Sequence, residues 1–236
     1  MQQSSMIKAI AIILFGMIAF DLMSITVRTL GSVFPILQIS VLRNLFGIIP
    51  AVILLALGPG FGAVTKLNKV DHWKIIFIRS AAVLMAQLAF YTALTKIEFA
   101  TAATLCFTSP FFVTLLSIPL LGHHIGLVRF AALIVGFAGV VAIFEPFNDD
   151  FTFWMVLPVV AGFGYGLSSV LVKLVPDDVP SAAIQITQQL ITFGMGACLL
   201  LISGEFVPIV SVNNFFYFVF MGFFGGVGVL CLIMAY

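Results

Sequence analysis

Eight apolar stretches, each long enough to cross a lipid bilayer as a helix, constrain the fold of this chain more than any other feature. A transmembrane helix needs roughly 20 predominantly apolar residues. Short segments rich in glycine, proline and charge separate the stretches. We therefore expect membrane-spanning helices near residues 7–29, 36–57, 74–95, 100–120, 126–145, 152–174, 181–203 and 213–236.

The composition excludes a water-soluble domain. The chain is 62% hydrophobic and 8% charged, whereas soluble domains carry about 25% charged residues. The net charge of +1 gives no reason to expect a nucleic-acid partner. The first apolar run continues past the length of a signal-peptide core and has no small-residue cleavage site, which favours an uncleaved first span. The sequence thus predicts an all-α integral membrane protein, a polytopic helix bundle in contact with the lipid bilayer.

The distribution of basic residues predicts the orientation of the bundle, because Lys and Arg accumulate on the cytoplasmic side. With a cytoplasmic N-terminus, the basic residues at the inner face are Lys8, Lys66, Lys69, Lys74, Arg129 and Lys173. Those at the outer face are Arg28 and Lys96, and the acidic loop with Glu145, Asp149 and Asp150 also lies outside. We predict a multi-pass protein of the cell inner membrane with its N-terminus in the cytoplasm.

An internal repeat appears when the sequence is shifted on itself by 145 residues. The shift aligns five pairs of residues: Ser24 with Ser169, Arg28 with Lys173, Pro35 with Pro180, Ile39 with Ile184, and Tyr91 with Tyr236. We predict a first five-helix repeat over residues 1–146 and a second over residues 147–236 that stops after its third helix. Since five is odd, the two repeats are expected to be inverted, with eight of an expected ten helices present. A truncated gene, a fragment or a shortened chain would each give this pattern.

Three segments resemble the EamA-like branch of the drug/metabolite transporter superfamily: "FDLMSITVRTLGSVFPILQISVLRNLFGIIP", "IRSAAVLMAQLAFYTALTKIEFATAATLCFTSPFFVTLLSIPLLG" and "GLVRFAALIVGFAGVVAIFEP". Arg28, Pro35, Arg43 and Pro110 match the order of basic residues and prolines typical of that family. The resemblance implies a ten-helix secondary transporter of a small organic metabolite, such as an amino acid or an S-adenosylmethionine-like solute. The chain departs from the family pattern in three features: the His123–His124 pair, Gln188 at the mirror position of Arg43, and the missing last two helices.

A carboxylate, Asp21, lies in the middle of the first apolar stretch and shares a helical stripe with Ser24 and Arg28. At 1.5 Å rise per residue it lies ~14 Å from the outer end of its helix, and Arg43 lies ~10 Å from the outer end of the next. The similar depths predict an Asp21–Arg43 ion pair. Two roles stay open, a structural link between helices and a site for substrate or a proton.

Polar residues share one face of the seventh predicted helix, and their counterparts share one face of the second. Inverted-repeat transporters bind substrate near the midplane, where the repeats meet. Interhelical hydrogen bonding alone is the other interpretation. Positions 186 and 190 are expected to face lipid. The residues that we expect along the substrate pathway are Asp21, Ser24, Arg43, Gln87, Tyr91, Thr108, Gln185, Gln188 and Thr192.

Three residues are expected to interrupt a helix or to let helices bend. Pro110 cannot donate to the carbonyl four residues before it. Gly162 and Gly166 have the spacing that permits close helix contact or a bending point, and no strand precedes them as in a phosphate-binding loop. The His123–His124 pair is expected to be a solvated turn, with a metal site as the alternative. We predict no metal and no cofactor.

The leading functional hypothesis is a secondary transporter that works by alternating access on a small-molecule substrate. A non-transporting remnant or partner subunit of such a carrier is an alternative, because two helices are missing. A membrane-embedded enzyme is a further alternative, but the sequence has no HExxH or GxSG motif and no second intramembrane aspartate. A coupling proton and a homodimer are left open.

Overall fold

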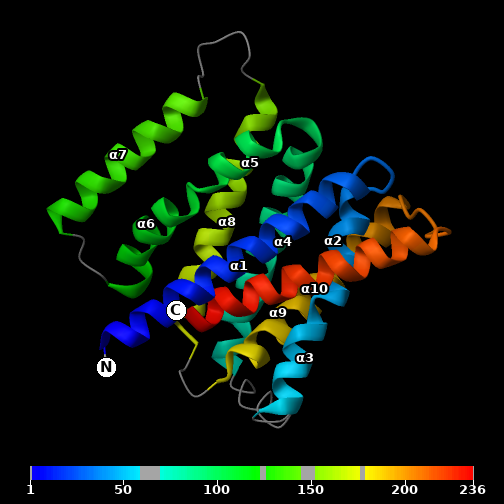
Figure 1. The fold of residues 1–236 in the computed structure, drawn as a ribbon, viewed down its shortest axis with the longest axis horizontal. Helices are drawn as coiled ribbons and strands as arrows, with labels where there is room; N and C mark the ends of the chain where they lie inside the picture. The colour runs from blue at the N-terminus through cyan, green and yellow to red at the C-terminus, as the bar shows by residue number, and fades with distance from the viewer. Residues whose placement is uncertain (1, 59–69, 123–125, 145–151, 176–178, 236) are drawn as a thin grey trace.

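The computed structural model describes residues 2–58, 70–122, 126–144, 152–175 and 179–235, and those residues form a bundle of helices without strands (Figure 1). The first half contains α1 (Gln2–Leu30), α2 (Ile36–Phe46), α3 (Ile48–Leu57), α4 (Val70–Lys96), α5 (Phe99–Cys106), α6 (Ser109–Leu121) and α7 (Leu127–Phe144). The second half contains the short 3-10 helix η2 (Phe153–Met155), α8 (Val156–Val172), α9 (Ser181–Ser203) and α10 (Val212–Ala235). The all-α polytopic class predicted from the sequence is confirmed.

Seven helical segments within the described residues are long and apolar enough to cross a membrane. They are Ile10–Leu30, Ile36–Leu57, Trp73–Lys96, Phe99–Leu121, Phe153–Val172, Ser181–Ser203 and Val212–Met234. The remaining predicted span, 126–145, coincides with α7, which contributes the shorter apolar segment Phe130–Val140. α7 lies at one edge of the bundle against α5 and α6 (Figure 1).

Two of these spans are interrupted, and a proline explains each interruption. α2 ends at Phe46 and α5 ends at Cys106, and in both cases a proline, Pro50 or Pro110, lies four residues further on. Because proline has no N–H, it cannot donate to the carbonyl four residues before it, and its ring crowds that carbonyl. The ladder therefore breaks at Gly47 in the second span and at residues 107–108 in the fourth. Sequence analysis predicted the effect of Pro110 but not that of Pro50.

The helix bounds repeat at the same 145-residue shift as the sequence. α2 begins one residue after Pro35 and α9 one residue after Pro180, and each proline has the extended backbone that starts a helix sharply (ψ 140° and 138°). α9 runs unbroken where α2 and α3 are separate, because the counterpart of Pro50 is Met195. The division of the chain at residue 146 itself stays a prediction.

The helix contacts made by the first half have equivalents made by the corresponding helices of the second half. α1 packs along α10, and its counterpart α8 packs along α4 (Figure 1). α2 contacts α10, its counterpart α9 contacts α4, and α2 and α9 contact each other. α2 and α9 therefore lie where the halves meet. The predicted inverted repeat requires counterpart helices to run in opposite directions, and that inversion stays a prediction.

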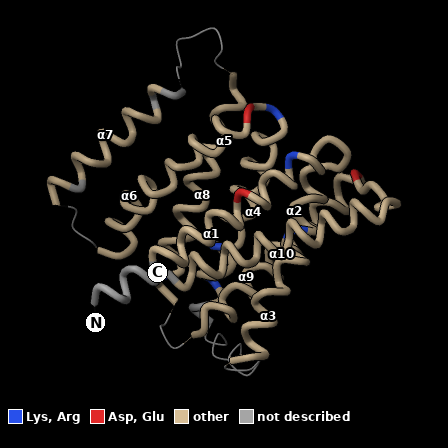
Figure 2. Tube along the Cα trace, in the orientation of Figure 1, with Lys and Arg blue, Asp and Glu red and all other residues tan. Residues whose placement is uncertain are grey.

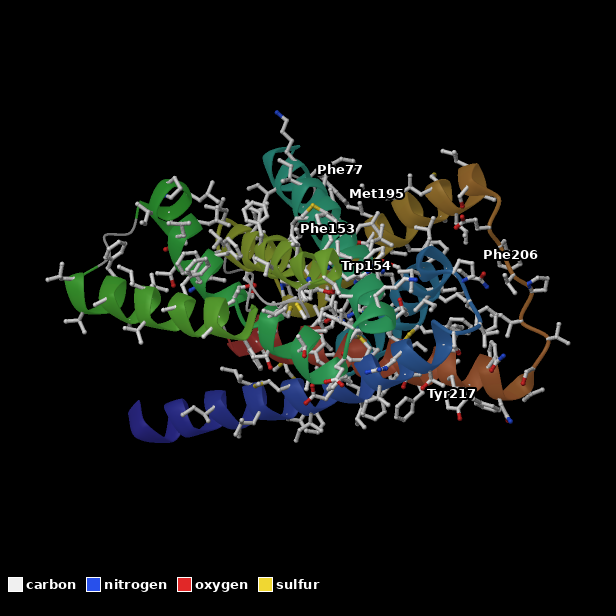
Figure 3. The ribbon with its side chains drawn as sticks, turned by 90° about the horizontal axis from the view of Figure 1, so that it is seen from above. Phe77, Phe153, Trp154, Met195, Phe206 and Tyr217 are labelled. Atoms are coloured by element: carbon white, nitrogen blue, oxygen red, sulfur yellow. The ribbon has the colours of Figure 1, made fainter. Side chains whose placement is uncertain are left out.

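Apolar side chains form the core of the bundle and also most of its outside. The largest buried cluster includes Met23, Val27, Phe90, Tyr91 and Phe218, from α1, α4 and α10. Large hydrophobic side chains are also exposed on the outside, as for Phe77 on α4, Phe206 in the segment before α10, and Tyr217 on α10 (Figure 3). Figure 2 shows how few charged residues the described helices carry. An apolar exterior of this extent fits a hydrocarbon environment.

Several residues used in the sequence analysis lie outside the described part of the chain. They are Lys66, Lys69, His123, His124, Glu145, Asp149, Asp150 and Tyr236.

Candidate functional site

A buried polar face on α2 meets a buried polar face on α9 at the contact between the halves. The α2 residues are Ser40, Arg43, Asn44 and Gly47; the shift of 145 residues places them on Gln185, Gln188, Gln189 and Thr192 of α9. The spacing of three and four residues puts each set on one side of its helix. Each of the seven polar side chains exposes 2% or less of its surface, and Gly47 is buried. In a membrane span, polar side chains face the bundle interior because hydrocarbon offers them no hydrogen bonds.

On the α2 side, Gln87 of α4 completes a closed network of hydrogen bonds. Ser40 Oγ and Asn44 Nδ2 both donate to Gln87 Oε1, at 2.9 and 2.8 Å. Gln87 Nε2 donates in return to Asn44 Oδ1 at 3.4 Å. Asn44 Nδ2 also donates to the Ser40 carbonyl at 2.7 Å. The side chains of Ser40, Asn44 and Gln87 are therefore paired with one another.

Arg43 carries a buried guanidinium whose hydrogen bonds are accepted by neutral oxygen atoms. Its Nη1 donates to Asn44 Oδ1 at 3.2 Å, and its Nη2 donates to the carbonyl of Gly225 on α10 at 2.9 Å. A Cβ at Gly225 would lie 2.8 Å from Arg43 Nε, so a glycine is needed for this approach. Arg43 also interacts electrostatically with Tyr91 of α4. Its Nε has no protein partner.

On the α9 side, the glutamine amides are only partly paired. Gln185 Nε2 donates to the carbonyls of Gly226 and Gly47, at 2.8 and 3.4 Å. Its Oε1, the Oε1 of Gln188, and both polar atoms of the Gln189 amide are buried without a protein partner. The Gln189 amide lies directly against Gly47, where a Cβ would collide with its Oε1. Buried polar atoms without partners are uncommon, and each one calls for an explanation.

Among the predicted pathway residues, Arg43 lies beside Tyr91, Gln87 bonds to the α2 face and Gln185 reaches Gly47, while Gln188 is buried on the same side of α9. The other predicted pathway residues lie apart from this cluster or bond elsewhere. Thr192 donates to the Ser80 carbonyl at 3.4 Å. Ser24 and Thr108 donate to carbonyls of their own segments, Phe20 at 2.7 Å and Leu105 at 2.9 Å. Participation of these residues in transport stays a prediction.

The predicted Asp21–Arg43 ion pair is wrong. Asp21 is exposed on the surface of α1, and Arg43 is buried against Asn44 and Gly225. α1 turns its apolar stripe, which includes Ala19, Met23 and Val27, toward the core. The stripe that carries Asp21 and Arg28 therefore faces outward. The similar depth of the two residues was not enough, because an ion pair also requires both side chains to face the same space.

One residue of the pair expected to face lipid was also misplaced. Leu190 is 51% exposed, as expected, but Ile186 is 8% exposed and packs with Ala51 and Leu55 of α3.

The glycine pairs sit at close helix crossings. A Cβ at Gly162 would collide with Thr108 Oγ1, and one at Gly166 would lie 2.9 Å from Phe112 Cβ, so both glycines pack against the α5–α6 break. Gly222 and Gly226 do the same against the α2–α3 break at Gly47. The glycines of α8 therefore cover the α5–α6 break, and those of α10 cover the α2–α3 break. Bending at Gly162, Gly166 or Pro110 stays a prediction.

Sequence reasoning missed Asn44, Gln189 and Arg79. Asn44 and Gln189 follow Ser40 and Gln185 by four residues, so helical spacing could have found them. Arg79 of α4 is 4% exposed; its Nε donates to the Ser168 carbonyl of α8 at 3.1 Å, and its Nη1 has no partner. It is a second buried guanidinium among the described helices.

Two other features of the described residues bear on ligand chemistry. An apolar groove of about 550 Å³ lies on the outside of α10, between Thr26 of α1 and Ile49 of α3, and it is lined mostly by Phe216, Phe220, Phe223 and Phe224. Its exposed aromatic lining suits lipid chains more than a polar solute. No cluster of three His, Cys, Asp or Glu side chains with metal-binding geometry occurs among the described residues.

Comparison with known proteins places most of the chain in one family. The sequence profile of the EamA-like transporter family matches residues 7–145. The chain is 39% identical over 89 residues to a riboflavin transporter of Vibrio cholerae serotype O1, a match that covers 37% of this chain and 30% of the relative. It is 38% identical over 72 residues to a riboflavin transporter of Rhizobium johnstonii, covering 30% and 24%.

A third similar protein extends the match. The riboflavin transporter of Brucella anthropi is 26% identical over 140 residues, covering 59% of this chain and 49% of the relative. The chain therefore spans about half or less of the length of the curated relatives that it matches. A solved crystal structure of a protein has the same fold, with a TM-score of 0.65 and 18% identity, over 95% of this chain and 79% of that one.

Proposed function

Because this chain belongs to the EamA-like transporter family, we propose that it is a secondary transporter that moves a small organic solute across the inner membrane by alternating access. The family match and the names of its relatives point to a transporter and not to an enzyme. One observation carries the proposal: a fully buried set of polar side chains lies where the helices of the two halves meet. In inverted-repeat transporters that position is where substrate binds.

The proposed substrate is riboflavin or a closely similar flavin. Three relatives are named riboflavin transporters. Riboflavin is uncharged and carries a planar ring rich in hydrogen-bonding groups. The polar faces of α2 and α9 offer amides, hydroxyls and one guanidinium, with no carboxylate among the described residues of the cluster. These hydrogen-bonding groups suit a neutral polar heterocycle. An ammonium-bearing amino acid or S-adenosylmethionine fits less well, because its positive charge would be repelled by Arg43 with no carboxylate nearby to offset it.

The proposed movement is a rocking of residues 1–146 against residues 147–236 around the α2–α9 contact. The interruptions at Gly47 and before Pro110 would absorb the change, because the backbone ladder is already broken there. Gly162 and Gly166 would let α8 slide on the second break. A cytoplasmic N-terminus, a coupling proton and a homodimer belong to the proposal as further parts to be tested.

Transport by the purified chain in proteoliposomes tests the proposal. We expect uptake of riboflavin, followed by its fluorescence, to exceed that of protein-free vesicles and to be competed by unlabelled riboflavin but not by leucine or S-adenosylmethionine. A pH gradient of either sign shows whether a proton is coupled. Binding without uptake would favour a partner subunit or remnant, and absence of both would contradict the proposal.

A further inference from the structure

The two polar faces that meet at the centre of the bundle are equivalent in sequence but unequal in hydrogen bonding. On α2, Ser40 and Asn44 are paired through Gln87 of α4. On α9, their counterparts Gln185 and Gln189 keep polar atoms without partners. The Ser40–Asn44–Gln87 group is therefore paired internally, whereas the α9 glutamines keep four buried amide atoms without protein partners.

The cause of the difference lies on α10. The helix that should complete the α9 face, as α4 completes the α2 face, is α10, and the counterpart of Gln87 there is Leu232. Leu232 is 36% exposed and has no hydrogen-bonding group. α10 supplies two backbone acceptors to this side, the carbonyl of Gly226 to Gln185 and that of Gly225 to Arg43. Neither carbonyl pairs with the Gln189 amide.

Four atoms of the α9 face remain without protein partners. Three are acceptors, the Oε1 atoms of Gln185, Gln188 and Gln189, and one is a donor, the Nε2 of Gln189. Gln189 is the only described glutamine of this face with both amide atoms unpaired, and none of its surface is exposed. An isolated buried amide is costly unless something fills its hydrogen-bonding capacity.

The pattern of these atoms selects a chemical class. A primary amide presents a donor beside an acceptor, and it pairs best with a group that presents an acceptor beside a donor. A carboxylate or phosphate has only acceptors and would face three more acceptors. An ammonium group has only donors and would leave Nε2 unpaired. The edge of a lactam or cyclic imide, a ring C=O next to a ring N–H, fits both amide atoms at once.

We infer that Gln189 is the residue that recognises the imide edge of the transported heterocycle, with the Gln185 and Gln188 oxygens beside it. This inference rests on the proposed function, because the pyrimidinedione ring of a flavin carries such an edge, a C=O, N–H, C=O sequence centred on N3. The Gln189 amide pairs with the ring N–H and one carbonyl. The α2 face, where Ser40 and Asn44 are paired through Gln87, lies opposite.

The test measures binding of riboflavin and of 3-methylriboflavin to the full chain in nanodiscs, by quenching of flavin fluorescence. Methylation at N3 removes the ring donor and leaves the rest of the molecule unchanged. We expect the wild-type chain to bind riboflavin at least about tenfold more tightly than the methylated analogue. Gln189→Met, which keeps the length of the side chain, should weaken riboflavin binding by about tenfold and abolish the discrimination.

Gln38→Met is the matched control. Gln38 is a fully buried glutamine on α2 whose amide is completely paired, donating from Nε2 to the Val207 carbonyl at 2.7 Å and accepting from the Val207 N–H at 2.8 Å. Replacing a paired amide should lower the melting temperature and leave flavin discrimination intact. Replacing the unpaired Gln189 amide should leave the melting temperature of the ligand-free chain unchanged or raise it.

The outcomes separate this inference from the proposed function. If the wild-type chain binds riboflavin and its methylated analogue equally, or if Gln189→Met keeps the discrimination, Gln189 does not recognise the imide edge and the transporter proposal stands. If Gln189→Met lowers the melting temperature as much as Gln38→Met does, the amide has a structural role and the inference is overturned. If the wild-type chain binds neither flavin, the proposed substrate is wrong as well.

Discussion

At the scale of single residues, the positive charge of Arg43 is stabilised by hydrogen bonds to neutral oxygen atoms. Its two terminal nitrogens donate to Asn44 and to the Gly225 carbonyl, and the described helices place no carboxylate beside it. Asp21, which the sequence had suggested as its partner, is exposed on α1. Hydrogen bonds to a charged group contribute about 1.5–3 kcal/mol each, so neutral acceptors can offset part of the cost of burial.

A double-mutant cycle of Asp21→Asn and Arg43→Gln tests this arrangement. Because the two side chains share no partner, their effects on the free energy of unfolding should add within about 0.5 kcal/mol. Asp21→Asn alone should change stability little, and Arg43→Gln should lower it, because Asn44 and Gly225 lose a donor. Unfolding in mixed micelles gives the four free energies. A coupling energy of about 2 kcal/mol or more between the two substitutions would contradict this arrangement and support an Asp21–Arg43 ion pair.

The reason that sequence placed Asp21 wrongly is physical. Helical spacing groups Asp21 with Ser24 and Arg28, but Ser24 is buried while Asp21 and Arg28 are exposed, because spacing alone does not say which residues of a stripe face the core. In water, the apolar stripe of a helix identifies the core; in a bilayer, both the core and the surroundings are apolar. Only the packing of α1 along α10 decides that Ala19 and Met23 face inward. Gln185 and Gln188 are buried on α9, and their part in transport stays a prediction.

At the scale of helices, close crossings over the two interruptions tie the bundle together. α10 passes the α2–α3 break with Gly222 and Gly226 toward Gly47, and α8 passes the α5–α6 break with Gly162 and Gly166. Small residues let helix backbones approach closely, which is a main source of helix association in membranes. Each break is therefore packed directly against one close helix crossing, α10 on the α2–α3 break and α8 on the α5–α6 break.

Gly226→Ala tests the first crossing. An added Cβ would collide with the backbone carbonyl of Gly47, which has no flexible end to move aside. We expect a loss of about 1–3 kcal/mol in the free energy of unfolding. Gly194→Ala on α9 is the matched control, because its Cβ meets nothing within 4 Å. That substitution should be neutral or stabilise the chain by about 0.5–1 kcal/mol. Equal effects of the two would contradict the crossing.

Pro110→Ala tests the break in the fourth span as a point of bending. Alanine restores the N–H that the Cys106 carbonyl lacks, so α5 and α6 can join into a continuous helix. We expect unchanged or higher thermal stability together with a fall of about tenfold in riboflavin uptake. Uptake and flavin binding are measured on the same preparation. An unchanged uptake rate would show that the movement does not use this break.

The location and length of the spans could be predicted from sequence more fully than their continuity. The predicted span 181–203 coincides with α9, whose bounds are Ser181–Ser203. The second span was expected as one helix, yet it breaks at Gly47. The mean hydropathy of the span does not reveal such a break, because the segments on both sides of it are apolar. Pro50 was the available signal, and Gly47, four residues after Arg43, gave a second.

At the scale of the whole molecule, the arrangement of the helices supports two oppositely oriented halves that share one polar centre. The pairs α1–α10 and α8–α4 are equivalent, and so are α2–α10 and α9–α4. The repeat was visible in sequence, because prolines and basic residues at helix ends survive a shift of 145 residues. The unequal hydrogen bonding of the α2 and α9 faces was not, since it depends on which side chains α4 and α10 place beside them.

The central claim, that α9 turns a polar face toward a shared, substrate-accessible centre and an apolar face toward lipid, is tested most directly by thiol labelling. Thr192→Cys and Leu190→Cys are introduced singly into a chain whose own three cysteines are replaced. Thr192 is buried on the polar face, and Leu190 is 51% exposed on the other side. We predict that a hydrophilic maleimide labels Cys at position 192 and that riboflavin slows the reaction, while position 190 stays unlabelled in the membrane. Labelling of position 190 alone, or labelling of 192 that riboflavin leaves unchanged, would contradict the account.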